Sequence, residues 1–166
     1  MDTRTPEDFR KAWTRQALQC LRLVLLFDDT DLALTPGPGA MSLEGQLAHL
    51  AAASEFTVDL LEQEHPTRDG FRRIPEYARV YDACRDLVRL LRRVQSASSS
   101  MTGDRWEERL ATLGGEWCLP RRELAFLMEE HSVHHTGALH VYARLAGKVP
   151  PKIYSPVDES LLVGLE

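Results

Sequence analysis

Four segments of the sequence carry apolar residues at steps of three and four, which is the spacing of one face of an α-helix. They begin near residues 6, 43, 74 and 120, and the last one continues to about residue 147. No stretch shows the alternation of apolar and polar residues that is typical of a half-buried strand. Because helices that each bury one apolar face pack together, the sequence predicts an all-α fold, a four-helix bundle.

Capping signals indicate where these segments begin and end. Thr5, followed by a proline, predicts the start of the first helix, which should run to about Phe27. Ser42 predicts the cap of the second helix. The last helix should begin at Pro120 and end near Gly147, because two prolines follow closely and cannot continue it.

The middle of the chain gives less definite signals. The third helix is expected to begin at Ile74-Pro75-Glu76. Residues Trp106–Leu110 could form a short helix, and Gly114-Gly115 predicts a break after it. The outer face of the third helix carries a group of basic residues: Arg85, Arg89, Arg92 and Arg93. We expect a solvated surface on which they form ion pairs with Asp82 and Asp86. Recognition of an anionic ligand is the alternative.

Composition limits the class of protein. A chain of 166 residues with 43% hydrophobic and 27% charged residues is typical of one globular domain, here expected to span residues 1–166. The formal charge of -5 argues against broad nucleic-acid binding, which needs a basic surface. The first residues lack the basic-then-apolar pattern of a signal peptide and no apolar run has membrane-spanning length, so neither a signal peptide nor a membrane span is expected. Three unpaired cysteines favour a reduced, cytoplasmic protein, and Cys20 is expected in the core.

A pair of histidines marks the last helix. His131 and His135 are four residues apart, so on a helix both imidazoles can reach one point in space. They fall within the apolar stripe, whereas His134 lies off its centre. Hydrogen-bonded core histidines are one interpretation of the pair, and metal ligands are the other. A catalytic zinc-type site needs three protein ligands and an open position, so a third ligand must come from another segment.

His49 is the best candidate for the third ligand, because it lies in the apolar second helix. At this point the sequence resembles the DinB/YfiT-like family, small helical proteins whose metal is bound by one histidine of the second helix and a His-x-x-x-His pair of the last. The resemblance covers nearly the whole chain, and the motifs that carry it are Met41-Ser42-Leu43, Leu47-Ala48-His49, His134-His135-Thr136-Gly137, Tyr142-Ala143-Arg144 and Gly147-Lys148-Val149-Pro150-Pro151.

The resemblance implies a fold and a site. Mapped by motif, His49, His131 and His135 are the ligands of a divalent metal, with zinc or nickel favoured. It also implies an up-up-down-down bundle and a homodimer. Tyr142, on the same face as His135, is a candidate substrate-binding residue, with core packing as the alternative. His65 is expected on the surface, and His134 and His140 are expected either on the surface or beside the ligands.

Two departures from the family pattern concern the reaction. Many relatives place an acidic residue directly after the first histidine of the last helix, but Ser132 occupies that position here. A base of the metalloprotease His-Glu-x-x-His type is therefore not supported. Many relatives have Arg-Gly-Gln after the histidines, whereas this chain has Thr136-Gly137-Ala138. Contacts with substrate that these positions make in relatives are therefore not expected to be the same here.

Three functions fit these observations. The resemblance favours a metal-dependent transferase that joins a low-molecular-weight thiol, of the bacillithiol or mycothiol type, to an electrophilic small molecule. A metal-dependent hydrolase that uses metal-bound water is the second, and it needs a general base, for which Glu55 and Glu130 are candidates. The third is a non-catalytic, stress-related dimeric scaffold that keeps an unused site.

Overall fold

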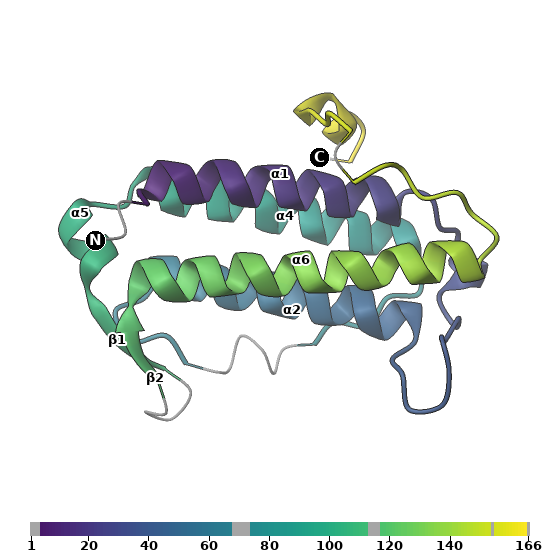
Figure 1. The fold of residues 1–166 in the computed structure, drawn as a ribbon, viewed down its shortest axis with the longest axis horizontal. Helices are drawn as coiled ribbons and strands as arrows, with labels where there is room; N and C mark the ends of the chain where they lie inside the picture. Colours follow the sequence, from purple (N-terminus) through teal and green to yellow (C-terminus); the bar gives the residue numbers. More distant parts are fainter. Residues whose placement is uncertain (1–3, 68–73, 113–116, 154, 166) are drawn as a thin grey trace.

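The computed structural model describes residues 4–67, 74–112, 117–153 and 155–165. Within these residues four long helices dominate: α1 (Pro6–Val24), α2 (Leu43–Glu62), α4 (Val80–Ser99) and α6 (Arg121–Leu145) (Figure 1). The shorter elements are the 3₁₀ helices η1 (Asp29–Asp31) and η3 (Glu159–Leu162), helix α5 (Gly103–Glu107), and strands β1 (Arg109–Thr112) and β2 (Trp117–Pro120). The prediction of an all-α four-helix bundle is confirmed.

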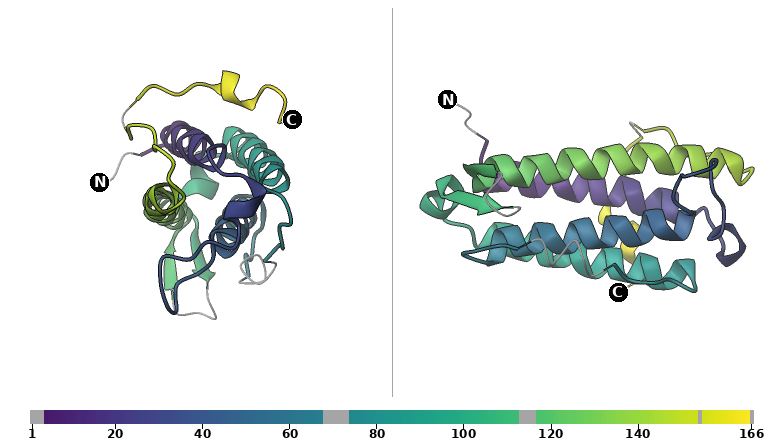
Figure 2. Two further views of the ribbon diagram at one scale, coloured as in Figure 1. Left: turned by 90° about the vertical axis from the view of Figure 1, so that its right-hand side faces the viewer. Right: turned by 90° about the horizontal axis from the view of Figure 1, so that it is seen from below.

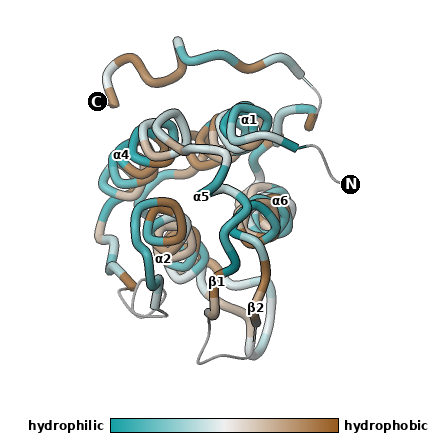
Figure 3. The backbone as a smooth tube through the Cα atoms, turned by 90° about the vertical axis from the view of Figure 1, so that its left-hand side faces the viewer, coloured by the Kyte–Doolittle hydropathy of each residue, from teal (hydrophilic) through white to brown (hydrophobic). Residues whose placement is uncertain are grey.

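The four long helices occupy the corners of a square when the bundle is viewed along its axis (Figures 2 and 3). Helices α1 and α2 each contact both α4 and α6, so α1 lies diagonally opposite α2, and α4 diagonally opposite α6. Helix α5 and the β1–β2 hairpin cover one end of the bundle (Figure 3). Helix α6 therefore has α1 on one side and α2 on the other.

The order of the helices differs from the up-up-down-down order that the resemblance implies. Taking α1 as up, α2 and α4 run down and α6 runs up (Figure 1). Residues 25–42 turn back, so that α2 starts at the end of the bundle where α1 finishes. Two hydrogen bonds bring the start of α4 to the same end, from Tyr77 N to Glu44 Oε1 (3.1 Å) and from Val80 N to Asp29 Oδ1 (2.8 Å). Sequence spacing could not decide this, because either long connection could span the bundle.

An aromatic cluster fills the core beneath α5. The ring of Phe9 lies 5.8 Å from those of Trp13 and Trp106 and 5.6 Å from that of Phe126, the last in an edge-on arrangement. The indole Nε1 of Trp106 donates a hydrogen bond to Arg4 O (3.0 Å). The cluster ties the start of α1 to α5 and to the first turns of α6, since aromatic pairs bury large areas in fixed geometries.

Arg121, the first residue of α6, is a fully buried charged side chain. Its guanidinium donates to the carbonyl oxygens of Leu60, Gln63 and Arg105 and pairs with the carboxylate of Glu108. Two of these oxygens belong to the C-terminal end of α2, where helix carbonyls have no partner within the helix. Arg121 therefore joins α2, α5 and α6 at this end of the bundle.

Several local predictions were wrong in the middle of the chain. Helix α4 begins at Val80, not at Ile74, because Tyr77 is held outside the helix by its bonds to Glu44 and Asp86. A helix, α5, forms slightly earlier than Trp106–Leu110, and a β hairpin follows where no strand was expected. Each strand has only four residues, which is too short for an alternation of apolar and polar residues to reveal it. The two strands pair through their backbones. The predicted break at Gly114-Gly115 lies outside the described residues.

The other helix ends agree with their signals, except that α1 ends at Val24 and not near Phe27 as predicted. The Thr5 side chain caps α1, and the Ser42 hydroxyl accepts from Gly45 N (3.0 Å) at the start of α2. Gly147 adopts a φ of 70° just after α6, a left-handed conformation that glycine accepts without strain. No helix in the described part of the chain has the length and apolar character needed to cross a membrane.

The C-terminal segment packs across α1 and α4 (Figure 2). Gln19 Nε2 donates to Ser155 O (3.0 Å), Arg92 pairs with Glu159 (2.6 Å), and Leu162 is buried. This segment leaves the outer side of α6 uncovered, as Figure 1 shows.

Candidate metal centre

The three predicted ligands meet between α2 and α6. Ligand nitrogens of His49, His131 and His135 lie within 4.8 Å of one another, and the Nε2 atoms of His49 and His131 are 3.0 Å apart. Their ring centroids are 4.5–5.1 Å apart. All three side chains are half-buried. In the described part of the chain this is the one group of three or more such residues placed to share an ion.

Contacts at both ends of α6 set its register against α2. At one end Arg121 binds carbonyl oxygens at the end of α2. At the other, the Tyr142 hydroxyl donates to Met41 O (2.7 Å), two residues before α2 begins. Because these two anchors limit sliding of the helices, His49 stays opposite the histidines at i and i+4 of α6.

Two glutamines contact this part of α6. Gln46, on α2 and 4% exposed, has its amide nitrogen 2.5 Å from Nδ1 of His135. Gln16, on α1, donates to Thr136 Oγ1 (2.7 Å) and to Ser132 O (3.1 Å). Neither residue was predicted from the sequence to lie at the site. The available signal for Gln46 was its position three residues before His49, which places the two on neighbouring parts of one helix face.

Burial keeps the three imidazoles neutral. It is the main cause that lowers the pKa of His49, His131 and His135. Each charged ring would also repel the others, and the pKa of His135 falls to about 4. A neutral imidazole is the form that binds a metal ion, so protons compete weakly for this site near neutral pH.

The stability of the metal-free protein is expected to fall as the pH drops from about 6.5 toward 4. The ordinary histidine pKa is 6.5, and that of His135 in the folded chain is about 4. Between these values the unfolded chain binds more protons than the folded chain, so the free energy of unfolding rises with pH. Urea titrations at pH 7 and pH 5 measure the change. A His135→Ala variant should lose less stability over this range, and a loss as large as that of the wild type would contradict the assignment.

The donor set fits a divalent metal ion. Three nitrogens bound tetrahedrally to zinc lie roughly 3.4 Å from one another. The separations in the site, 3.0 Å for one pair and within 4.8 Å for all, bracket that value. Three neutral donors from the protein leave a position for another ligand, which is typical of catalytic rather than structural sites. The role of the three histidines as ligands stays a prediction that this geometry supports.

The two candidate bases are placed differently from the histidines. Glu55 accepts from Arg93 Nη1 at 2.5 Å and lies 3.6 Å from Arg89, so its carboxylate is held toward α4. Glu130 is exposed. Among the described residues, no hydrogen bond or ion pair joins either carboxylate to the three histidines.

The remaining site candidates occupy surface or core positions. His65 and His134 are exposed, and His140 is partly exposed. The ring of His134 lies 5.1 Å from that of His135, which places it at the edge of the site. Tyr142 is 3% exposed and anchors Met41 through its hydroxyl, and its substrate-binding role stays a prediction.

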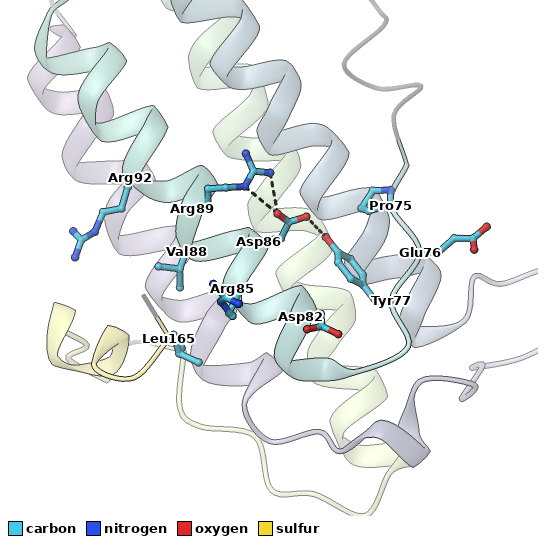
Figure 4. A pocket seen from close by; sticks show the side chains of 10 residues that line it. All are labelled: Pro75, Glu76, Tyr77, Asp82, Arg85, Asp86, Val88, Arg89, Arg92 and Leu165. Carbon is cyan, nitrogen blue, oxygen red and sulfur yellow. Dashed lines mark hydrogen bonds and ion pairs between the residues drawn. The ribbon is translucent and has the colours of Figure 1, made fainter.

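The arginine-rich face of α4 borders a separate pocket of about 840 Å³ (Figure 4). Arg89 pairs with Asp86 (2.9 Å), which also accepts from the Tyr77 hydroxyl (2.8 Å). Arg92 is paired with Glu159 (2.6 Å). The predicted solvated face carries acid pairs, but of the predicted partners only Asp86 pairs with one of the four arginines in the part of the chain that the structure describes. Asp82 pairs with Arg79, and Arg93 pairs with Glu55 and Glu62. The pocket contains none of the three clustered histidines.

Comparison with known structures gives the same fold. A DinB-like protein of Bacillus cereus matches with a TM-score of 0.75 at 18% identity, over 89% of this chain and 97% of that one. The DinB-like protein YjoA of Bacillus subtilis matches with a TM-score of 0.73 at 16% identity, over 87% and 96% of the two chains. No curated protein sequence matches.

A third structure, YfiT of Bacillus subtilis, is described as "a probable metal-dependent hydrolase with an unusual four-helix bundle topology". It matches with a TM-score of 0.70 at 14% identity, over 90% of this chain and 91% of that one. The family model of the DinB family matches residues 1–161, nearly the whole sequence. The chain therefore belongs to the DinB family.

Proposed function

We propose that the protein is a metal-dependent transferase that joins a low-molecular-weight thiol to an electrophilic small molecule. The observation that carries this proposal is the convergence of His49, His131 and His135 on one half-buried point, with their imidazoles neutral near pH 7. A bound divalent ion, with zinc or nickel favoured, would lower the pKa of a thiol placed in its open position. The three histidines would hold the ion, and their half-buried position between α2 and α6 would partly shield it from water.

Hydrolysis is the second candidate, because the similar structure YfiT is described as a probable metal-dependent hydrolase. A hydrolase of the metalloprotease type has a carboxylate base beside its ligands. Here Ser132 follows the first histidine of α6, and Glu55 is held by Arg89 and Arg93. Thiol transfer requires less of the protein, because a thiol is far more acidic than water and, beside a bound ion, would lose its proton to solvent without a protein base. This difference favours the transferase.

Gln46 is expected to orient His135 for metal binding. A histidine that binds metal through Nε2 carries its proton on Nδ1, which then needs an acceptor. The Gln46 amide is 2.5 Å from that Nδ1 and can present its oxygen by rotating half a turn about its last side-chain bond. Gln46→Leu should weaken metal binding about tenfold to a hundredfold. Competition with a chromogenic chelator measures the affinity.

Gln46→Glu is the matched variant, because a carboxylate also accepts from Nδ1–H. It should keep metal affinity near or above that of the wild type. If Gln46→Leu bound metal as tightly as the wild type, the positioning role would be refuted.

Turnover of the metal-loaded protein tests the proposed function. Bacillithiol and mycothiol are each offered with an electrophile such as a haloarene or an epoxide, and ester and amide substrates are offered without thiol. Metal-dependent loss of free thiol supports the transferase, whereas metal-dependent ester or amide cleavage supports the hydrolase. Full metal loading without turnover in any assay would favour the dimeric scaffold.

A further inference from the structure

The pocket on the α4 side of the bundle is separate from the metal centre (Figure 4). Its volume of about 840 Å³ lies within the range of small-molecule sites, about 300–1,000 Å³. Three segments form it: residues 75–77, the outer face of α4, and Leu165 in the segment that crosses α1 and α4. Helix α4 lies diagonally opposite α6, and none of the described residues that line the pocket is a histidine. A molecule bound here would therefore not contact the three clustered histidines.

The floor of the pocket is apolar. Tyr77, Val88 and Leu165 line it and are 8%, 2% and 8% exposed, respectively. Leu165 is kept in place by the contacts of its segment with α4, among them a hydrogen bond from the Tyr81 hydroxyl to Gly164 O (3.4 Å). Because these side chains are fixed by the fold, the apolar surface is present before any ligand arrives.

One wall of the pocket is basic. Arg85, Arg89 and Arg92 line it and follow one another at steps of four and three residues, so they project from one side of α4 over about 10 Å. All three side chains are exposed. Arg92 pairs with Glu159 of the C-terminal segment (2.6 Å), so its charge is already matched.

The acids beside this wall are also paired. Asp86 accepts hydrogen bonds from Arg89 (2.9 Å) and from the Tyr77 hydroxyl (2.8 Å). Asp82 pairs with Arg79 (2.7 Å), which does not line the pocket. The hydrogen bonds from Arg79 are the main cause that lowers the pKa of Asp82, and the charge of Arg85 is a smaller one. Asp82 is therefore occupied by another arginine.

Arg85 is the basic residue without an acidic partner. It forms neither a hydrogen bond nor an ion pair with any residue that the structure describes. Glu76, the remaining acid of the lining, is exposed, and its side chain points away from the arginines in Figure 4. The wall therefore presents one positive charge, above an apolar floor, that the protein leaves unmatched.

We propose that this pocket binds a small organic acid, whose carboxylate pairs with Arg85 and Arg89 and whose apolar body lies on Val88 and Leu165. Arg89 uses Nε and Nη2 to bind Asp86, and among the described residues its Nη1 donates to no acceptor. Two guanidinium groups one helical turn apart can hold the two oxygens of one carboxylate. A single unmatched charge suits a carboxylate better than a phosphate monoester, which carries nearly two negative charges at pH 7.

Binding of 1-naphthoate tests the proposal, because this probe carries one carboxylate on a flat apolar ring system. The protein is freed of metal beforehand, since a carboxylate also binds metal ions. Isothermal titration calorimetry of the wild type should give one site per chain with a Kd below about 1 mM. 1-Naphthamide has the same body without the charge and should bind at least about tenfold more weakly.

Three variants locate the site. Arg85→Met should weaken binding of 1-naphthoate at least about tenfold, because methionine keeps an apolar side chain and removes the guanidinium. Arg144→Met, the same change at an exposed arginine of α6, is the matched control and should bind the probe like the wild type. His49→Ala should also bind it like the wild type, because the pocket does not include the clustered histidines.

The proposal would be overturned by a wild type that does not bind the probe, by equal binding of the acid and the amide, or by Arg85→Met binding like the wild type. Loss of binding in His49→Ala would place the probe at the histidines and would overturn it as well. Position has a second readout, because backbone amide shifts in NMR spectra should change mainly in residues 75–92 and at Leu165. Changes confined to α6 would contradict the assignment. None of these outcomes depends on which reaction the metal centre performs.

Discussion

Replacement of His49 by alanine is expected to abolish binding of the divalent metal ion. The wild type, purified without a polyhistidine tag, should contain about one ion per chain, and the variant almost none, because two imidazoles alone make an incomplete site. The ligand nitrogens of His49, His131 and His135 lie within 4.8 Å of one another, so loss of any one removes a third of the donor set. Elemental analysis of both proteins measures the content.

The matched control is His65→Ala, which removes an exposed histidine outside the cluster. It should bind metal like the wild type. Both variants should keep their helix content, since alanine is the most favourable residue in a helix and His65 lies outside the helices. Retention of a full metal complement by His49→Ala, or by His135→Ala, would exclude the three-histidine site.

Replacement of Arg121 by methionine is expected to lower the free energy of unfolding by about 3 kcal/mol. The side chain is fully buried, and methionine keeps much of its volume but none of its donors. The carbonyl oxygens of Leu60 and Gln63 at the end of α2 would lose their partner, and Glu108 would lose its ion pair. Urea unfolding followed by circular dichroism measures the difference.

Arg85→Met is the control for this change, because Arg85 is exposed on α4. Its effect should stay within about 0.5 kcal/mol, as is usual for surface substitutions. A loss of less than about 1 kcal/mol in Arg121→Met would show that its four contacts contribute little to stability. Since Arg121 also anchors α6 on α2, the variant should bind metal more weakly even under conditions where it is folded.

Local patterns were sufficient for the helices and for part of the site. Apolar residues at steps of three and four identified four helices, and Thr5, Ser42 and Gly147 marked their ends, since capping is decided by a few neighbouring residues. The spacing of His131 and His135 brought two imidazoles to one face for the same reason. Its place in the apolar second helix made His49 the best candidate for the third ligand, and the resemblance to a known family then implied the set of three.

Periodicity carries no information on the direction of a helix or on its neighbours. The up-down-down-up order depends on hydrogen bonds such as that from Val80 N to Asp29, which joins residues 51 positions apart. The start of α4 shifted from Ile74 to Val80 because contacts with other elements held the intervening residues outside the helix. Local preference is weak compared with such tertiary contacts.

The sequence alone therefore establishes four amphipathic helices and a pair of histidines placed to share a ligand. Only the tertiary structure decides that α2 faces α6, that His49 reaches the pair, and that Gln46 lies against His135. These features depend on the register between two antiparallel helices, which Arg121 sets at one end and Tyr142 at the other. The physical reason is that helix formation follows from neighbouring residues, whereas register follows from packing and hydrogen bonds between residues far apart in the chain.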